Sequence, residues 1–140
     1  MIAPTRTTAA VGESLPGFEK HFSQIDLVAY GAATWDWHRL HYDLEYARSK
    51  NLPGTLVDGQ AFGALFARAA MDWAGPKAFV TRLSFKMKSM AFAGDTLVGS
   101  GEVAAVEADG AELKVTLRQR LMNRDRLTAE ATTEVRLPAA

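Results

Sequence analysis

The sequence contains no cysteine, and this absence excludes two kinds of chemistry. Without cysteine there is neither a disulfide framework nor a thiolate that acts as a nucleophile or a metal ligand. The N-terminal residues 1–6 also lack the continuous apolar stretch that a secretory signal peptide requires. We therefore expect a cytoplasmic protein.

Long apolar runs and a surplus of one charge are missing as well. The most apolar stretch, residues 61–67, ends at Arg68 and falls well short of the roughly 20 apolar residues that span a bilayer. Lys and Arg number 16, as do Asp and Glu, so the formal net charge is zero. We therefore expect no membrane segment and no nucleic-acid partner.

What the sequence does contain is typical of one globular domain. Its 140 residues are 48% hydrophobic and 23% charged, which is ordinary for a folded domain. A chain of this length can bury a substantial core by itself. We expect residues 1–11 to form a flexible N-terminal arm and residues 12–140 to form a single domain.

Two short helices are predicted in the first half of the chain, after a strand at residues 18–22. Ser23 and Asp26 have the spacing of a capping box, and apolar residues then recur at helical intervals. A second helical segment covers residues 43–50 and is ended by a Pro-Gly pair. Both helices lie close in sequence to the candidate site described below.

The longest predicted helix covers residues 60–73 and is rich in alanine and glycine. Small side chains allow such a helix to approach a sheet closely, and a Gly-Pro pair directly after it ends the helix. Gly63, Ala64 and Ala67 share roughly one face. That face either packs against the sheet or lines a tunnel for a bound chain.

Beyond this helix, polar and apolar residues alternate as in strands with one buried face and one solvent-exposed face. Turn signals at Asp109-Gly110 and at residues 123–125 separate these strands. The order of the elements predicts an α+β fold with an antiparallel sheet around one long central helix. The alternating apolar positions are Leu83, Phe85 and Met87; Leu113, Val115, Leu117 and Leu121; and Leu127, Ala129, Ala131, Val135 and Leu137.

Asp36 and His41 are the candidate catalytic pair. They lie five positions apart in a segment with no clear helix or strand period. A carboxylate and an imidazole in this arrangement can hold one water between an acid and a base, and imidazole exchanges protons near neutral pH. The alternative is a structural hydrogen-bonded pair within a loop.

Gly59 stands at the predicted start of the main helix, directly after Asp58. A helix start presents backbone N–H groups that can stabilise a developing oxyanion. We expect Asp58 to cap this helix. A thioesterase would instead give Asp58 or Gln60 a catalytic role.

The other side chains around the pair allow further interpretations. His38, His41 and Asp43 are legitimate ligand types for a metal, but the only other histidine is His21, and we expect no metal. We expect the aromatic residues of this segment to pack beneath the loop. They are Trp35, Trp37, Tyr42 and Tyr46.

Taken together, the motif resembles that of the MaoC-like (R)-specific enoyl-CoA hydratases and dehydratases. That family carries Asp-x-Asn-Pro-x-His-x-Asp followed by Tyr-Ala, and then a glycine that opens the central helix. The resemblance extends over nearly the whole chain from Phe18 onward. The matching positions are Asp36, His38 in place of Asn, Arg39 in place of Pro, His41, Asp43, Tyr46-Ala47 and Gly59.

The resemblance implies a hotdog fold and a hydro-lyase that interconverts a trans-2-enoyl-CoA and a (R)-3-hydroxyacyl-CoA without a cofactor. Asp36, His41 and Gly59 would be catalytic. The residues that would bind the acyl-CoA substrate are His38, Arg39, Gln60 and Ala64.

The resemblance also implies an assembly of several chains. We expect a homodimer or a larger even oligomer. The run Asp72-Trp73-Ala74-Gly75-Pro76 is similar to the catalytic small subunit of steroid side-chain enoyl-CoA hydratases, which are heteromers of two hotdog chains. The alternatives to a self-sufficient hydratase are therefore a hotdog acyl-CoA thioesterase and a subunit that is active only with a second hotdog chain.

Overall fold

The structure is a computed structural model that describes residues 3–140. One antiparallel sheet of five strands, in the order β1-β3-β4-β5-β2, forms its main layer. In chain order the elements are β1 (Phe18–His21), α1 (Gln24–Thr34), the 3-10 helix η1 (Arg39–His41), α2 (Leu44–Ser49), α3 (Gln60–Ala74), β2 (Phe79–Met87), β3 (Thr96–Asp109), β4 (Glu112–Asn123) and β5 (Arg126–Pro138).

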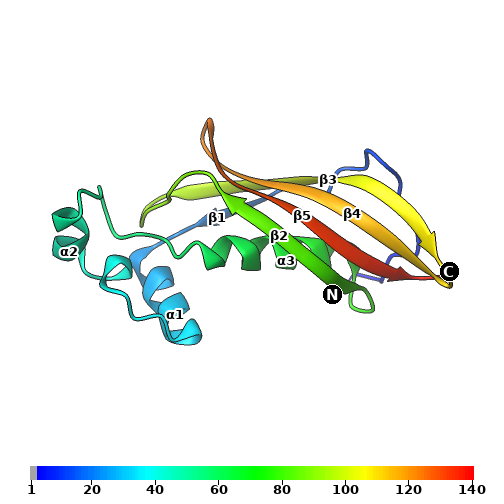
Figure 1. Cartoon of the computed structure of the whole chain (residues 1–140), viewed down its shortest axis with the longest axis horizontal. Coiled ribbons are helices and arrows are strands. Elements are labelled where there is room, and N and C mark those ends of the chain that lie inside the picture. Colours follow the sequence, from blue (N-terminus) through cyan, green and yellow to red (C-terminus); the bar gives the residue numbers. More distant parts are fainter. Residues whose placement is uncertain (1–2) are drawn as a thin grey trace.

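The long helix α3 runs along one face of the sheet, while α1, η1 and α2 gather at the end where α3 begins (Figure 1). The predicted α+β arrangement is confirmed. The main helix ends one residue beyond the predicted Trp73. The predicted capping box of α1 is also confirmed, because the side chains of Ser23 and Asp26 each accept the other residue's backbone N–H.

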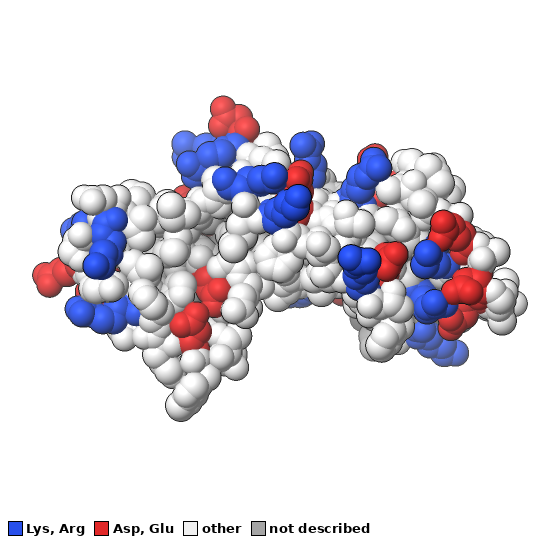
Figure 2. All heavy atoms as spheres, viewed as in Figure 1, with Lys and Arg blue, Asp and Glu red and all other residues white. Residues whose placement is uncertain are grey.

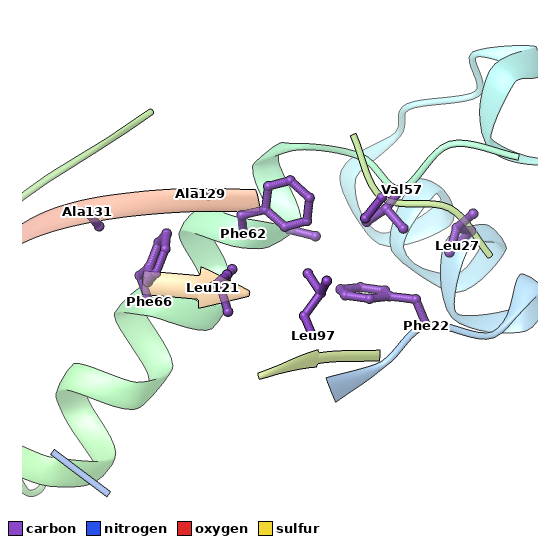
Figure 3. Packing of buried hydrophobic residues seen from close by; sticks show 11 residues of the cluster. Phe22, Leu27, Val57, Phe62, Phe66, Leu97, Leu121, Ala129 and Ala131 are labelled. Carbon is purple, nitrogen blue, oxygen red and sulfur yellow. The ribbon is translucent and has the colours of Figure 1, made fainter. Parts of the chain in front are cut away.

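Helix α3 packs against the sheet through one face. Phe62, Phe66, Ala70 and Trp73 follow one another at helical intervals and are all buried. Phe62 and Phe66 meet Leu97, Leu121 and other apolar side chains of the sheet (Figure 3). The core at the start of α3 also includes Leu27 of α1, so this core attaches α1 to the rest of the domain.

Gly63 of α3 packs directly against Phe85 of the edge strand β2. A Cβ at this position would lie 2.6 Å from Cε1 of Phe85, closer than a real contact allows. For Gly63, therefore, the packing interpretation of the small-residue face is correct. Ala64, the next residue, is exposed and does not pack against the sheet.

A buried polar bridge joins the sheet to α3. Gln119 of β4 is 2% exposed. Its amide donates to the carbonyl of Phe66 at 3.0 Å and accepts from the hydroxyl of Thr133 at 2.6 Å. Gln119 and Thr133 therefore occupy buried positions of the alternating strands although they are polar. Their hydrogen bonds offset the free-energy cost of burying polar groups.

Met87 departs from the predicted alternation. It lies at the end of the edge strand β2 and is 63% exposed, although its place in the pattern predicted burial. An edge strand has no neighbour on one side, so alternation alone does not determine burial at its end. The Met87 side chain instead reaches Gly59, as described below.

The N-terminal segment that was expected to be a flexible arm makes defined contacts from Thr5 onward. The backbone N–H of Arg6 donates to the carbonyl of Ala74 at 2.9 Å, and the Thr5 hydroxyl accepts from the N–H of Lys77 at 2.9 Å. The Arg6 guanidinium also lies 4.7 Å from the ring centre of Trp73. These contacts attach the segment to the end of α3. Residues 1–2 of the predicted arm lie outside the described residues.

The face of the molecule seen in Figure 2 carries charges of both signs. Figure 2 shows Lys and Arg interspersed with Asp and Glu over the sheet, and an uncharged lower margin at the end that holds α1. Among residues 3–140, no helix combines the length and the apolar character needed to cross a membrane.

Candidate active site

The turn after α1 positions Asp36. Trp35 ends the helix with a left-handed backbone (φ 58°), and the N–H of Asp36 donates to the carbonyl of Gly31 at 2.9 Å. A Cβ on Gly31 would lie 2.7 Å from the Asp36 carbonyl oxygen. Only glycine at position 31 allows the chain to reverse this tightly.

His38 orders the loop between Asp36 and His41. Its backbone N–H donates to Oδ1 of Asp36 at 3.2 Å, and its ring Nδ1 accepts from the N–H of Leu40 at 3.1 Å. The second bond caps η1, the 3-10 helix that carries His41. In this structure, His38 shapes the loop through both of these hydrogen bonds.

Leu56 connects this loop to the segment that leads into α3. Its N–H donates to the carbonyl of Leu40 at 2.8 Å, and its carbonyl lies 2.7 Å from Nδ1 of His41. A carbonyl only accepts hydrogen bonds, so Nδ1 of His41 carries a hydrogen. In the neutral ring, Nε2 of His41 is then a free proton acceptor.

Nε2 of His41 lies 3.4 Å from Oδ2 of Asp36. The His41 side chain is 12% exposed and that of Asp36 is 38% exposed, so the pair opens to solvent on the Asp36 side. The pKa of Asp36 lies below its ordinary value, first because of the hydrogen bond from the His38 N–H and then because of the charge of His41. Asp36 is therefore an anion beside an oriented imidazole.

Asp58 joins this pair. Asp36, His41 and Asp58 each offer one oxygen or nitrogen atom within 4.8 Å of the others. The cap expected of Asp58 is present in modified form: its Oδ1 accepts the N–H of Gln60 at 2.9 Å, but Gly59 occupies the N-cap position. Its Oδ2 is buried and has no hydrogen-bond partner among residues 3–140.

Gly59 directly follows Asp58 in the chain and is the N-cap residue of α3. Its N–H donates to no acceptor within residues 3–140. A Cβ at this position would lie 2.0 Å from Sδ of Met87, so a side chain here would displace Met87. The free N–H is a hydrogen-bond donor in the position where the sequence predicted an oxyanion contact.

The remaining predicted site residues differ in exposure and in their contacts. Gln60 and Ala64 are exposed on the first two turns of α3. Arg39 is engaged within the loop: its guanidinium donates to Oδ2 of Asp43 at 2.7 Å and lies 4.4 Å from the ring centre of Tyr46. Part of the Arg39 side chain nonetheless remains solvent-exposed.

The aromatic residues beside the pair do not all pack beneath the loop, and the prediction is wrong for three of them. Trp35 is 81% exposed, Trp37 is 46% exposed, and Tyr42 is similarly exposed. Trp35 and Trp37 meet edge to face, with ring centres 5.9 Å apart. Tyr46 alone is partly buried, between Arg39 and His38.

The sequence did not reveal that Asp58 approaches Asp36. An aspartate before a helix start has a sufficient local explanation as a cap. The approach arises from the backbone pairing of Leu56 with Leu40, a long-range contact that has no spacing signature. The nearness of Tyr30 to Asp58, reflected in a raised Tyr30 pKa caused first by burial and second by the Asp58 charge, was hidden for the same reason.

Known proteins resemble the chain in sequence and in structure. A family model described as MaoC like domain matches residues 6–124. The beta subunit of the 3-oxo-4,17-pregnadiene-20-carboxyl-CoA hydratase of Mycobacterium tuberculosis is 29% identical over 120 residues, which cover 86% of this chain and 93% of the relative.

Two solved structures show the same fold. A chain of the ChsH1-ChsH2 complex from Mycobacterium tuberculosis superposes with a TM-score of 0.80 and 25% identity, covering 93% of this chain and 99% of that chain. The (R)-hydratase from A. caviae involved in PHA biosynthesis gives a TM-score of 0.82 with 23% identity, covering 95% of this chain and 100% of that chain. The predicted hotdog fold is confirmed. Because the family match spans most of its length, the chain belongs to the MaoC-like domain family.

Proposed function

We propose that this chain is a hydro-lyase that interconverts a trans-2-enoyl-CoA and a (R)-3-hydroxyacyl-CoA. The observation that carries the proposal is the pair of Asp36 and His41, whose reactive atoms lie 3.4 Å apart with the imidazole oriented by the Leu56 carbonyl. The similarity to a subunit of a CoA-thioester hydratase supports the same reaction class.

In the hydration direction, the two residues hold and activate one water. Its oxygen bonds to C3 of the enoyl thioester while the C2–C3 double bond becomes a single bond. Nε2 of His41 accepts one hydrogen of the water as a proton and passes it to C2, and Asp36 accepts a hydrogen bond from the other hydrogen. One water is added in total, and His41 ends neutral as it began.

The thioester oxygen gains negative charge as C3 is attacked. We propose that the N–H of Gly59, at the positive end of α3, binds that oxygen, because it donates to no acceptor within residues 3–140. Gln60 and Ala64 on the exposed side of α3 would contact the acyl part. Arg39 would bind the CoA phosphates through the N–H groups of its guanidinium that do not donate to Asp43.

A self-sufficient oligomer and a two-chain enzyme are both compatible with this chemistry. The relative from Mycobacterium tuberculosis is named as a beta subunit, and a solved neighbour is a complex of two differently named chains. We propose that the chain works as a homodimer or a larger even oligomer, with activity only beside a second hotdog chain as the alternative.

The test is an absorbance assay at the enoyl-thioester band with a panel of CoA esters, from crotonyl to branched and sterol-derived acyl groups. We expect reversible loss of the band without release of free thiol. Thiol release instead would make the chain a thioesterase. Activity that appears only after a second hotdog chain is added would establish the heteromeric alternative.

The same assay tests whether a metal takes part. Asp36, His41 and Asp58 lie close enough together to offer three ligands, but the proposed steps need none of them to bind a cation. We expect activity to survive prolonged chelation followed by metal analysis. A stoichiometric metal whose removal abolishes turnover would overturn the proposed mechanism.

A further inference from the structure

Asp58 has one carboxyl oxygen that the fold leaves unsatisfied. Oδ1 accepts the Gln60 N–H at 2.9 Å and thereby caps α3. Oδ2 is buried, and no donor of the described chain reaches it. A buried acceptor without a donor lowers the stability of the folded protein. Helix capping therefore accounts for Oδ1 but not for the burial of Oδ2.

The nearest polar neighbours of Asp58 cannot satisfy Oδ2 while both carboxyls are ionised. Atoms of Asp36 and His41 lie within 4.8 Å of the Asp58 carboxyl. Asp36 offers only acceptor oxygens, and Nε2 of His41 is an acceptor whenever the ring is neutral. Two like charges at this distance favour a single shared proton.

We propose that Asp58 is a positioning residue, which carries the proton of the Asp36–Asp58 pair and donates it as a hydrogen bond to Asp36. The bond satisfies the buried oxygen, and it holds Asp36 ionised and aimed at Nε2 of His41. This role rests on the proposed hydratase function, in which Asp36 must accept a hydrogen bond from the attacking water.

The surroundings of Asp58 agree with this arrangement. The pKa of Asp36 lies below its ordinary value, first because of the hydrogen bond from the His38 N–H and then because of the charge of His41, which agrees with Asp36 as the ionised member of the pair. The titratable groups close to Asp58 are Asp36 and His41 of the loop and Tyr30 of α1, while β2 contributes the uncharged Met87 beside Gly59. No lysine or arginine forms an ion pair with Asp58 among residues 3–140.

The proposal predicts a specific dependence on pH. When the shared proton leaves at higher pH, two carboxylates repel each other and Asp36 loses its orientation, so turnover falls. In Asp58→Asn the amide donates the same hydrogen bond without titrating, and its oxygen can still cap Gln60. In Asp58→Ala both contacts disappear.

The experiment measures kcat and KM against pH for the wild-type oligomer, Asp58→Asn and Asp58→Ala, with Glu45→Gln on the exposed face of α2 as a control. We expect Asp58→Ala to lower kcat by about tenfold or more, the effect of losing a hydrogen bond to a charged group. Asp58→Asn should rescue most of this loss at neutral pH and move the alkaline fall of kcat to higher pH. Thermal melts show whether loss of the helix cap at Gln60 destabilises a variant and thereby contributes to its loss of kcat.

Two kinetic outcomes would overturn the proposal. If Asp58→Asn is as impaired as Asp58→Ala in a folded protein, Asp58 acts as an anion and not as a donor. If both variants match the wild type at every pH, Asp58 does not position Asp36. In either case a wild type that hydrates enoyl-CoA leaves the proposed function standing.

A second measurement tests the proton pair without any turnover. Carbon NMR of the Asp36 carboxyl should show one titration step more in the wild type than in Asp58→Asn, because the effect of the neighbouring His41 is common to both proteins. Identical titration curves in the two proteins would refute the shared proton. A wild type that hydrates no member of the CoA panel would refute the proposed function, and the NMR result would still decide the pairing.

Discussion

Each reactive side chain at the candidate site is held by a contact with the backbone. The Leu56 carbonyl determines which nitrogen of His41 bears hydrogen, and the His38 N–H holds one oxygen of Asp36. Backbone contacts of this kind fix orientation before a substrate arrives, so little reorganisation is needed during reaction. The reactivity of the pair therefore depends on the loop that carries it as well as on the two residues.

Replacing either member of the pair should reduce turnover severely without unfolding the protein. We expect Asp36→Asn and His41→Ala each to lower kcat by about 10²–10⁴-fold, because each removes one half of the acid–base pair. The double variant should be little worse than the single ones, since residues that act as a unit are not additive. Enoyl-CoA hydration and thermal melts provide the two measurements, with Glu45→Gln as the control. Near-wild-type activity of both single variants would place the site elsewhere.

The sequence predicted Asp36, His41 and Gly59 because each stands in a local pattern: a spaced motif or a helix start. The structure brings Asp36 and His41 close to Asp58, which directly precedes Gly59, through the pairing of Leu56 with Leu40. Long-range pairing of this kind leaves no periodicity in the chain, so the approach of Asp58 could not be predicted. The exposure of Trp35 and Trp37 was missed because apolar character alone favours burial.

At the level of elements, the short helix α1 leads directly into the turn that positions Asp36. Its capping box fixes the first turn, and the left-handed Trp35 fixes the last. The capping box is a local signal in the sequence, which is why the start of this helix was predictable. The sheet order β1-β3-β4-β5-β2 was not predictable from the chain, because it places β2 beside β5 across more than one intervening strand.

The capping box of α1 should make stability depend on pH. The pKa of Asp26 is lowered, first by the hydrogen bond from the Ser23 N–H. A lowered folded-state pKa means that the contribution is full above the unfolded pKa of about 3.9 and is lost as pH falls through the folded pKa. Asp26→Asn should therefore destabilise the protein at neutral pH and have less effect in acid.

Urea unfolding at several pH values measures this effect. Ser23→Ala, which removes the other half of the box, should cost about 1 kcal/mol at neutral pH. Gln24→Ala is not a suitable control because Gln24 bonds the His41 carbonyl and Thr55, whereas Glu45→Gln is suitable. An effect of Asp26→Asn that is independent of pH would contradict the assignment.

The exposed and buried sides of α3 allow a test of whether Ala64 contacts the acyl part of the substrate. Ala64 is exposed, whereas Ala70 is fully buried. Ala64→Leu should leave the free energy of unfolding unchanged within about 0.5 kcal/mol, and should lower kcat/KM for bulky enoyl-CoAs while sparing crotonyl-CoA.

The matched control is Ala70→Leu, which should cost about 1–3 kcal/mol through overpacking and reduce activity toward all substrates alike. Chemical unfolding and a short-to-bulky substrate series compare the two variants. A uniform loss of activity in Ala64→Leu, with unchanged stability, would remove Ala64 from the acyl site.

At the scale of the whole molecule, the sheet has two free edges, β1 and β2. The β2 edge carries Phe79, which is 69% exposed, and the partly exposed end at Met87. Free edges with exposed apolar side chains favour pairing with another chain. Met87 also lies over Gly59, so covering this edge would affect the site itself.

We expect a dimer or a larger even assembly in solution, with contacts along β2. Phe79→Lys should weaken the assembly, because a charge would be buried at the interface. Val11→Lys is the control: Val11 is 67% exposed, and its neighbour Gly12 bonds β3, on the far side of the sheet from β2. Sizing with light scattering decides the matter, and a stable, active monomer at micromolar concentration would overturn the expectation.

The two exposed indoles beside Asp36 give the protein an optical reporter of its own. Trp35 and Trp37 face solvent, whereas Trp73, the third tryptophan, is buried beneath the N-terminal segment. Exposed indoles emit at longer wavelength and are reached by soluble quenchers, while a buried one is shielded. Any molecule or chain that covers the entrance to the site would therefore shift the emission to the blue and protect it from quenching, so occupancy could be followed in unlabelled protein.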